Sequence, residues 1–271
     1  MVEFHGERMC ETVPKKKKER IFGLDLVRGL LILMVFFDHF LFDAAFMFRN
    51  AFVTDFGISI ANFAYEYQFS TFRAVFNPIG HFIFFSLSGI VTSFSRSGIK
   101  RPLKYTAVAL LITLATFLLE KVMGGFYLIT FGVLFAFAVS AFIAFFLDKL
   151  KTSKWILLAV GLIISFVGLM YIYGGWTFLA EDLYFLFYTE SAKMITADYF
   201  PIFPYVGYFL IGMFLGKIFY KEKKPYIKFP SLIKKTTGWI AFLGKTSLWW
   251  YLLSQVLFYG IFSVVTYFGV L

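Results

Sequence analysis

Residues 23–43 read GLDLVRGLLILMVFFDHFLFD and carry five ionisable side chains within an otherwise apolar stretch. The five are Asp25, Arg28, Asp38, His39 and Asp43. A charged side chain at the centre of a membrane-spanning helix costs at least about 2.5–3.5 kcal/mol, so such residues usually face the interior of a helix bundle and mark a functional site. The stretch therefore predicts a membrane span with a polar site inside it.

The composition of the whole chain supports a membrane protein. Of its 271 residues, 60% are hydrophobic and 15% are charged, against roughly 25% charged in a typical soluble domain. The single cysteine, Cys10, allows neither an intramolecular disulfide nor a cysteine-based metal site, and we expect no bound metal. The net charge of +10 is compatible with nucleic acid, but the basic residues lie between apolar stretches, where they report membrane orientation. We expect no nucleic-acid partner.

Seven stretches are long enough to cross a hydrocarbon core of about 30 Å, which takes ~20 residues of helix. They are residues 21–47, 79–95, 105–120, 126–147, 155–174, 201–219 and 246–269. The first has no small-residue cleavage site, so we expect it to remain as an anchor behind a basic tail, residues 1–20. The predicted fold is an all-α, polytopic membrane bundle that forms one domain over residues 21–271.

Basic residues gather on one side of these predicted spans. They are Lys15 to Lys18, Arg20, Arg96, Lys100, Arg101, Lys104, Lys149, Lys151, Lys154 and the block from Lys217 to Lys235. Cytoplasmic loops carry an excess of Lys and Arg, so the N-terminus is predicted inside a bacterial plasma membrane and, after seven spans, the C-terminus outside. Two long outer segments, 48–78 and 174–201, either cover a pocket or anchor interfacial helices. Residues 231–244 predict an interfacial helix on the cytoplasmic side.

The polar residues of the first span divide by direction and by depth. At 100° per residue, Asp25, Arg28, His39 and Asp43 fall within an arc of about 60°, and His39 lies roughly 16 Å beyond Arg28. This separation suits a reaction in which Arg28 grips a cytosolic anionic donor and His39 takes a proton from an outer acceptor. Either Asp43 or Asp38 could orient the imidazole. The structural alternatives are a helix-end ion pair between Asp25 and Arg28 and a purely interhelical hydrogen bond for His39.

The segment from Asp25 to Gly29, followed by His39, resembles the Arg-x10-His motif of the transmembrane acyltransferase superfamily. Phe84-Phe85-Ser-Leu-Ser88-Gly89-Ile resembles the second-helix signature of that superfamily, and a short basic loop to Arg101 follows. The chain is most similar to the bacterial branch of the heparan-α-glucosaminide N-acetyltransferase catalytic family. The later landmarks of that family read here FGVLF (131–135), DYFPIFPY (198–205) and GKTSLWWYLLSQ (244–255), so the resemblance spans nearly the whole chain. Phe135 and Ser254 stand where the family usually has histidines.

The resemblance implies transfer of an acetyl or similar acyl group from cytosolic acyl-coenzyme A to an amine or hydroxyl, usually of a sugar, on the outer side. His39, with Asp43 and Asp38, would then carry the proton transfer. Donor binding would involve Arg28, Asp25, Arg96, Arg101 and Lys104, although plain positive-inside topology explains the loop residues equally well. Acceptor binding would involve Asp198, Gln255 and His81.

Two other functional classes remain open at this stage, partly because Phe135 and Ser254 replace family histidines. One is a transporter or flippase for a lipid-linked sugar, in which the intramembrane charges line a path. The other is a catalytically inactive relative that acts as a membrane partner. An acyltransferase requires a basic cytosolic mouth that narrows onto His39, whereas a flippase requires a lateral opening. The expected partners are membrane lipids, acyl-coenzyme A and an extracytoplasmic glycan, and an oligomer is possible.

Overall fold

The computed structural model describes residues 20–95, 98–125, 127–220 and 224–269, and their regular structure is helical. The longer helices are α1 (Phe22–Phe42), α2 (Asp55–Gln68), α3 (Thr71–Ser93), α4 (Lys100–Met123), α5 (Val133–Lys149), α6 (Lys154–Tyr173), α8 (Ile202–Phe219) and α11 (Ser247–Tyr267). The shorter ones are the π-helical turn η1 (Asp43–Met47), the 3-10 turn η2 (Arg49–Ala51), α7 (Glu190–Lys193), α9 (Ser231–Thr236) and α10 (Gly238–Lys245). The predicted all-α bundle is confirmed.

Six of the described helices are long and apolar enough to cross a membrane, which makes the chain a multi-pass membrane protein. They are Phe22–Met47, Thr71–Ser93, Lys100–Val122, Lys154–Tyr173, Ile202–Phe219 and Ser247–Tyr267. The remaining predicted span, residues 126–147, corresponds to α5, which begins only at Val133 and has 17 residues. Its length is therefore about 26 Å, at the short end of the range for a spanning helix.

The late start of α5 follows from the segment in front of it. The α4 helix ends at Gly124 and Gly125, whose φ angles are +64° and +123°, a region that glycine adopts without steric cost. The chain then runs extended beside residues 196–200. Leu128 O accepts from Ala197 N at 2.8 Å, and Phe131 O accepts from Phe200 N at 2.9 Å. These pairings use backbone groups that a longer α5 would have bonded within itself.

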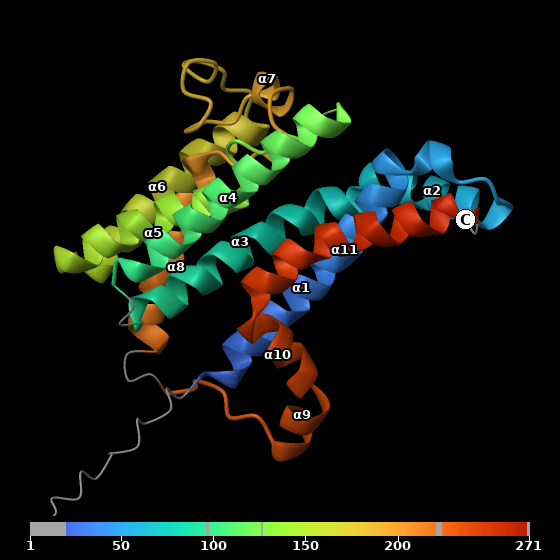
Figure 1. Cartoon of the computed structure of the whole chain (residues 1–271). Coiled ribbons are helices and arrows are strands. Elements are labelled where there is room, and N and C mark those ends of the chain that lie inside the picture. Colours follow the sequence, from blue (N-terminus) through green and yellow to red (C-terminus); the bar gives the residue numbers. More distant parts are fainter. Residues whose placement is uncertain (1–19, 96–97, 126, 221–223, 270–271) are drawn as a thin grey trace, which may run out of the picture.

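The helices form two groups that meet along α3 (Figure 1). On one side lie α4, α5, α6 and α8, and on the other lie α1, α11 and α2, with α9 and α10 next to the start of α1. The α3–α8 interface is close because Gly89 packs on the Phe209 carbonyl and Gly212 on the Ser86 carbonyl, where a Cβ would clash. Small residues permit such close packing between membrane helices. The predicted interfacial helix over 231–244 is two short helices, and Gly29 packs on Ile240 to bring α10 against α1.

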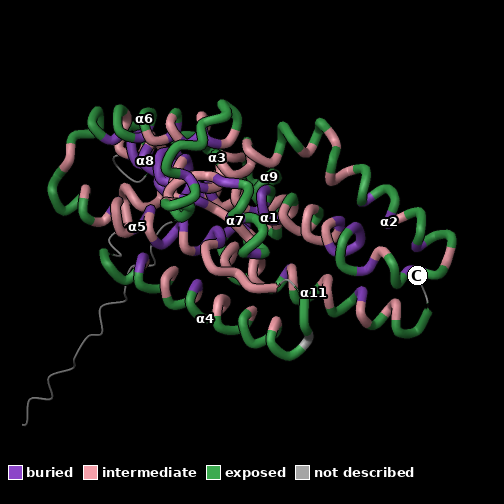
Figure 2. The backbone as a smooth tube through the Cα atoms, turned by 90° about the horizontal axis from the view of Figure 1, so that it is seen from above, coloured by how far each residue is buried: buried purple, intermediate pink, exposed green. Residues whose placement is uncertain are grey.

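Burial is uneven, as Figure 2 shows: buried residues gather in α3, α5 and α8, whereas α2 and α4 are largely exposed. The main core is aromatic and includes Phe85 stacked on Phe137, with ring centroids 4.0 Å apart. A second cluster joins the end of α1 to α2 and α11 around Phe262. Apolar side chains on the outside of a bundle are expected where lipid takes the place of water.

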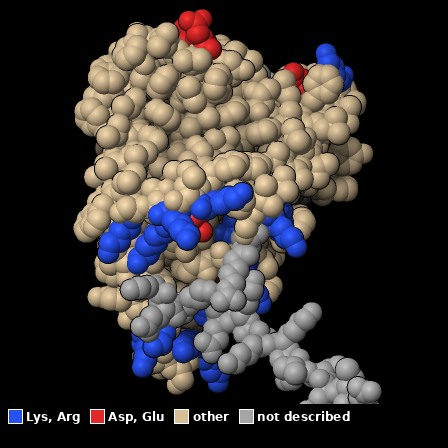
Figure 3. All heavy atoms as spheres, turned by 90° about the vertical axis from the view of Figure 1, so that its left-hand side faces the viewer, with Lys and Arg blue, Asp and Glu red and all other residues tan. Residues whose placement is uncertain are grey.

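Charges separate along the bundle. In the face shown in Figure 3, most Lys and Arg side chains gather in the lower part, whereas the upper edge carries acidic side chains with a basic group beside one of them. This is the segregation expected from the basic loops of the sequence. The direction in which the bundle crosses the membrane stays a prediction.

Candidate functional site

Arg28 lines a small cavity in the middle of the bundle. Its Nη2 donates to the carbonyl oxygen of Leu87 on α3 at 3.1 Å. The cavity measures about 60 Å³, and its other walls are Phe84, Ser88, Tyr105, Val133, Leu134, Phe137, Ser247, Leu248 and Tyr251. A volume of this size holds about two water molecules, each of which takes ≈ 30 Å³ in the liquid. Helices α1, α3, α4, α5 and α11 thus converge on one guanidinium group.

The other basic candidates lie around this cavity at the basic end. Arg101 donates to Thr92 Oγ1 at 2.5 Å and to Ser95 Oγ at 2.9 Å, which fixes the corner between α3 and α4. The Lys104 ammonium lies 5.9 Å from the centroid of the Trp249 ring on α11. Asp25 pairs with Arg20 at 3.7 Å rather than with Arg28. Arg96 lies outside the described residues.

His39 is held by the last helix. Its Nδ1 lies 2.8 Å from Ser254 Oγ, and Ser254 Oγ donates to the Tyr251 carbonyl at 2.7 Å. Because a hydroxyl has only one proton to give, Nδ1–H of His39 is the donor in the first bond. The Nε2 atom of the neutral ring then carries the lone pair, as a proton-accepting base requires.

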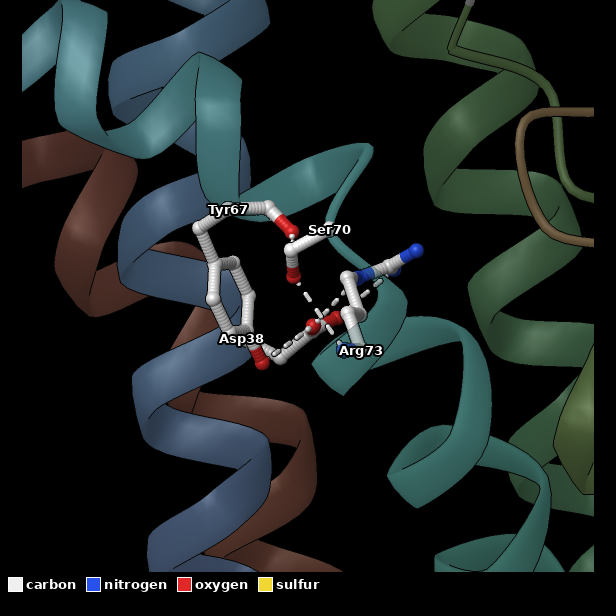
Figure 4. Close-up of polar contacts among 4 residues, drawn as sticks. All are labelled: Asp38, Tyr67, Ser70 and Arg73. Carbon is white, nitrogen blue, oxygen red and sulfur yellow. Dashed lines mark hydrogen bonds and ion pairs between the residues drawn. The ribbon is translucent and has the colours of Figure 1, made fainter.

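The two aspartates have other partners. Asp43 opens the π-helical turn η1, is fully buried, and accepts from Gln255 Nε2 at 2.6 Å through Oδ1. Its Oδ2 has no hydrogen-bond partner among the described residues. Asp38 accepts from Arg73 Nε at 2.8 Å and from Arg73 Nη2 at 3.2 Å (Figure 4). Ser254, rather than either aspartate, thus hydrogen-bonds the imidazole in the structure, and the role of the two aspartates stays a prediction.

The physical reason is the helix period. Consecutive residues differ by 100° in direction, so Asp38 faces α2 and α3 whereas its neighbour His39 faces α11. Asp43, four residues after His39, faces α11 as well and meets Gln255. A π-helical turn, like the one that begins at Asp43, is frequent at functional sites.

Tyr251 connects the two ends of the site. Its side chain lines the Arg28 cavity, and its ring centroid lies 5.8 Å from that of His39. Sequence reasoning quoted this tyrosine within a motif but did not select it. A signal existed: Tyr251, Ser254 and Gln255 have i, i+3 and i+4 spacing, which puts them on one helix face.

Asp198 and His81 lie toward the opposite end from the basic loops. Asp198 Oδ2 accepts from Val133 N at 3.1 Å and so caps the start of α5, and Val133 is itself a wall of the Arg28 cavity. Burial raises the pKa of the Asp198 carboxyl to about 6, opposed by hydrogen bonds from backbone N–H groups. The His81 ring packs at 4.9 Å from Phe200 and 5.9 Å from Tyr205. Asp198 thus begins the aromatic segment 198–205, and His81 packs against it.

The fold and site define a class: a multi-pass helical membrane protein with an arginine cavity and, further along the same helix, a half-buried histidine. The family model described as Heparan-alpha-glucosaminide N-acetyltransferase, catalytic, matches residues 20–256, and the chain belongs to this family. The match runs from the start of α1 into α11 and includes every site residue described above. Enzymes of this family transfer acetyl groups from acetyl-coenzyme A in general. No curated protein and no solved structure matches the chain.

Phe135 and Ser254, which replace the usual family histidines, have ordinary structural surroundings. Phe135 stacks on Phe131 with ring centroids 5.7 Å apart. Ser254 is fully buried and bonds to His39. Both positions therefore lack an imidazole, but Ser254 makes a polar contact to His39.

Proposed function

We propose that this protein transfers an acetyl group from cytosolic acetyl-coenzyme A to an amine or hydroxyl of a sugar-like acceptor at the far side of the bacterial plasma membrane. The observation that carries the proposal is the position of Tyr251, which lines the Arg28 cavity and contacts the His39 ring. His39 does not itself line that cavity, so Tyr251 is the residue that links a donor held at Arg28 to a base at His39.

In the proposed reaction, the acceptor nitrogen or oxygen bonds to the acyl carbon and loses its proton to His39 Nε2. The C–S bond of the thioester breaks, and the sulfur leaves as the coenzyme A thiol after protonation. The Ser254 hydroxyl keeps the imidazole in the tautomer that accepts at Nε2. A positioned general base of this kind typically contributes about 10²- to 10⁴-fold to the rate.

Arg28 holds an anionic or carbonyl part of the donor, and Arg101, Lys104 and Arg96 attract the coenzyme A phosphates toward the basic end. Guanidinium groups bind phosphate in a bidentate way that an ammonium cannot reproduce. The cavity of about 60 Å³ is large enough for the acetyl group but not for the whole pantetheine arm. We therefore expect the helices around Arg28 to separate when the donor enters.

The acceptor side comprises Gln255, Asp198 and His81. Asp43 holds the Gln255 amide in place. Asp38 precedes His39 in the sequence, and its carboxylate pairs with Arg73. We assign both aspartates a positioning role, without a direct bond to the imidazole.

A second candidate is a catalytically inactive family member. The observation in its favour is the replacement of two family histidines by Phe135 and Ser254. It predicts that acetyl-coenzyme A binds at Arg28, or does not bind, without any transfer to an acceptor.

The two candidates can be separated in proteoliposomes that contain the purified protein. Radiolabelled acetyl-coenzyme A is supplied on the side of the basic loops, and glucosamine, as the probe acceptor, on the other. The proposal requires N-acetylglucosamine to appear in the acceptor compartment, and a His39→Ala vesicle preparation serves as the control. Donor binding without product in the wild type would support the inactive relative.

A further inference from the structure

A second and larger hollow lies on the lateral surface, apart from the Arg28 cavity. It measures about 460 Å³, within the range of ~300–1,000 Å³ typical of ligand pockets. Its lining residues are Phe37, Phe63, Glu66, Tyr67, Ser70 and Phe72, and we call it the α2 groove. Three of the six are phenylalanines with exposed fractions of 47%, 58% and 57%. The groove is thus apolar along its phenylalanine side and open laterally, while Glu66, Tyr67 and Ser70 form its polar side.

The α2 groove lies at membrane depth. Phe37 belongs to the spanning segment Phe22–Met47. It comes 15 residues after Phe22, which corresponds to about 22 Å along the helix, within a hydrocarbon core of about 30 Å. The groove therefore opens into the half of the bilayer away from the basic loops, where lipid chains are the available occupants.

One end of the groove is polar. Tyr67 and Ser70 line it and also contact the charged pair, since the Tyr67 hydroxyl lies 3.5 Å from Asp38 Oδ1 and Ser70 Oγ caps Arg73 N at 3.2 Å (Figure 4). The side chains of Asp38 and Arg73 are each 26% exposed. Charges at this depth are costly and usually serve a site. A chain in the groove would bring its head group to a bidentate carboxylate–guanidinium pair.

This polar end is adjacent to the proposed base. Asp38 lies between Phe37, which lines the groove, and His39 in the sequence, so the Cα atoms of Asp38 and His39 are about 3.8 Å apart although their side chains differ by 100° in direction. An ordinary boundary lipid requires only apolar surface, whereas a polar head beside this pair finds both hydrogen-bond acceptors and donors.

We propose that the α2 groove holds the hydrocarbon chain of a lipid-anchored acceptor, whose hydroxyl- or amine-bearing head lies at Asp38 and Arg73 and reaches His39. This inference rests on the proposed acetyl transfer and narrows the acceptor to an amphipathic lipid. The chain keeps the head group beside the Asp38–Arg73 pair through van der Waals packing in the groove, because lipid tails are as apolar as the groove and removal from water adds nothing there.

The first test compares two acceptors in nanodiscs, glucosamine and dodecyl glucosaminide, with acetyl-coenzyme A as donor. We expect the alkyl compound to have a KM at least tenfold lower, and Phe63→Ala to remove most of this advantage. Phe166→Ala on α6 is the matched control, because Phe166 and Phe63 have the same exposed fraction of 58%. Partition into the bilayer favours the alkyl acceptor equally in the wild type, Phe63→Ala and Phe166→Ala. Only a difference in KM between the two variants therefore shows that the chain binds in the α2 groove.

The second test does not depend on activity. A dodecyl glucosaminide with a diazirine near the end of its chain is irradiated in the nanodisc, and labelled residues are mapped by mass spectrometry. We expect labels at residues 37 and 63–72 that unlabelled dodecyl glucosaminide displaces. Labels spread evenly over α4 and α6 would identify a boundary lipid only and would overturn the proposal.

The two tests separate failure of the groove from failure of the enzyme. If glucosamine and dodecyl glucosaminide are both acetylated and Phe63→Ala matches Phe166→Ala, the groove proposal is wrong and the acetyl transfer stands. If neither is acetylated while labels concentrate in the groove, the lipid site stands and the proposed reaction is wrong.

Discussion

His39 and Ser254 are joined by a bond of 2.8 Å between Nδ1 and Oγ, although 215 residues separate them in the chain. The bond connects α1 to α11 at the level where Tyr251 lies between His39 and the Arg28 cavity. Since Ser254 gives its own proton to the Tyr251 carbonyl, it accepts from the imidazole and leaves Nε2 free. A serine in the place of a family histidine therefore fixes the orientation of the histidine that remains.

Replacement of Ser254 by Ala should lower kcat while the KM for acetyl-coenzyme A stays the same. The change leaves the half-buried Nδ1–H of His39 without an acceptor, which costs about 1–3 kcal/mol, or roughly 5- to 160-fold if the cost falls on the reactive orientation. Ser254→Thr keeps the hydroxyl and should restore most of the rate. Steady-state kinetics on the two variants decide this, and an equal loss in both would point to packing alone.

Replacement of His39 by Ala should lower kcat by roughly 10²- to 10⁴-fold, the contribution of a positioned general base, and leave donor binding largely intact. Acetyl-coenzyme A binding is measured by calorimetry on the same detergent-purified sample. A histidine with a purely structural role would instead reduce the yield of folded protein. In that case the folded remainder would have normal specific activity, which contradicts the mechanism.

Arg28→Lys should raise the KM for acetyl-coenzyme A with little change in kcat. Lysine keeps the charge but loses the planar fork that bonds to the Leu87 carbonyl and to the donor together. Arg49→Lys provides the control, because it makes the same exchange at an arginine that does not line the cavity and bonds to Asn62 instead. If Arg28→Lys behaves like Arg49→Lys, Arg28 does not hold the donor.

Asp198 should make stability depend on pH. The pKa of its carboxyl is raised to about 6 in the folded protein, above the value of about 3.9 in an unfolded chain. Between these two values the folded state binds more protons than the unfolded state. The contribution of Asp198 to the free energy of unfolding is therefore fully present below about pH 4 and is lost as the pH rises through about 6. Thermal unfolding of Asp198→Asn between pH 4 and 8 should lack this decline, while the wild type shows it.

Orientation can be tested with single cysteines in a Cys10→Ser background. A cysteine at Lys151 or Lys235 should resist a membrane-impermeant thiol reagent added to intact cells, because basic loops remain in the cytoplasm. A cysteine at Lys193, in the acidic outer segment, should react. Rapid modification at Lys235 together with protection at Lys193 would reverse the topology and remove the proposed direction of transfer.

Local patterns in the sequence are sufficient for much of this protein. Apolar stretches of about 20 residues predict membrane spans because a bilayer sets that length, and six helices in the described part of the chain meet this length. The separation of Arg28 from His39 also follows from the sequence, since the helical rise is constant. The α5 helix is the exception, because its start depends on backbone bonds to residues 196–200 that are distant in the chain.

The partners of the polar side chains depend on tertiary structure. The helix period determines that Asp38 and His39 point in different directions, but not which helices lie there. Because α3 packs beside this part of α1, Asp38 bonds to Arg73. Because α11 packs on the other side, His39 bonds to Ser254 and Asp43 bonds to Gln255. The α2 groove likewise requires α2 to fold back beside Phe37. Sequence by itself determined the spans, the charge asymmetry and the polar residues of α1, because these depend on neighbours along the chain. Only the tertiary structure decided which of those residues share a site, because that depends on contacts between helices far apart in sequence.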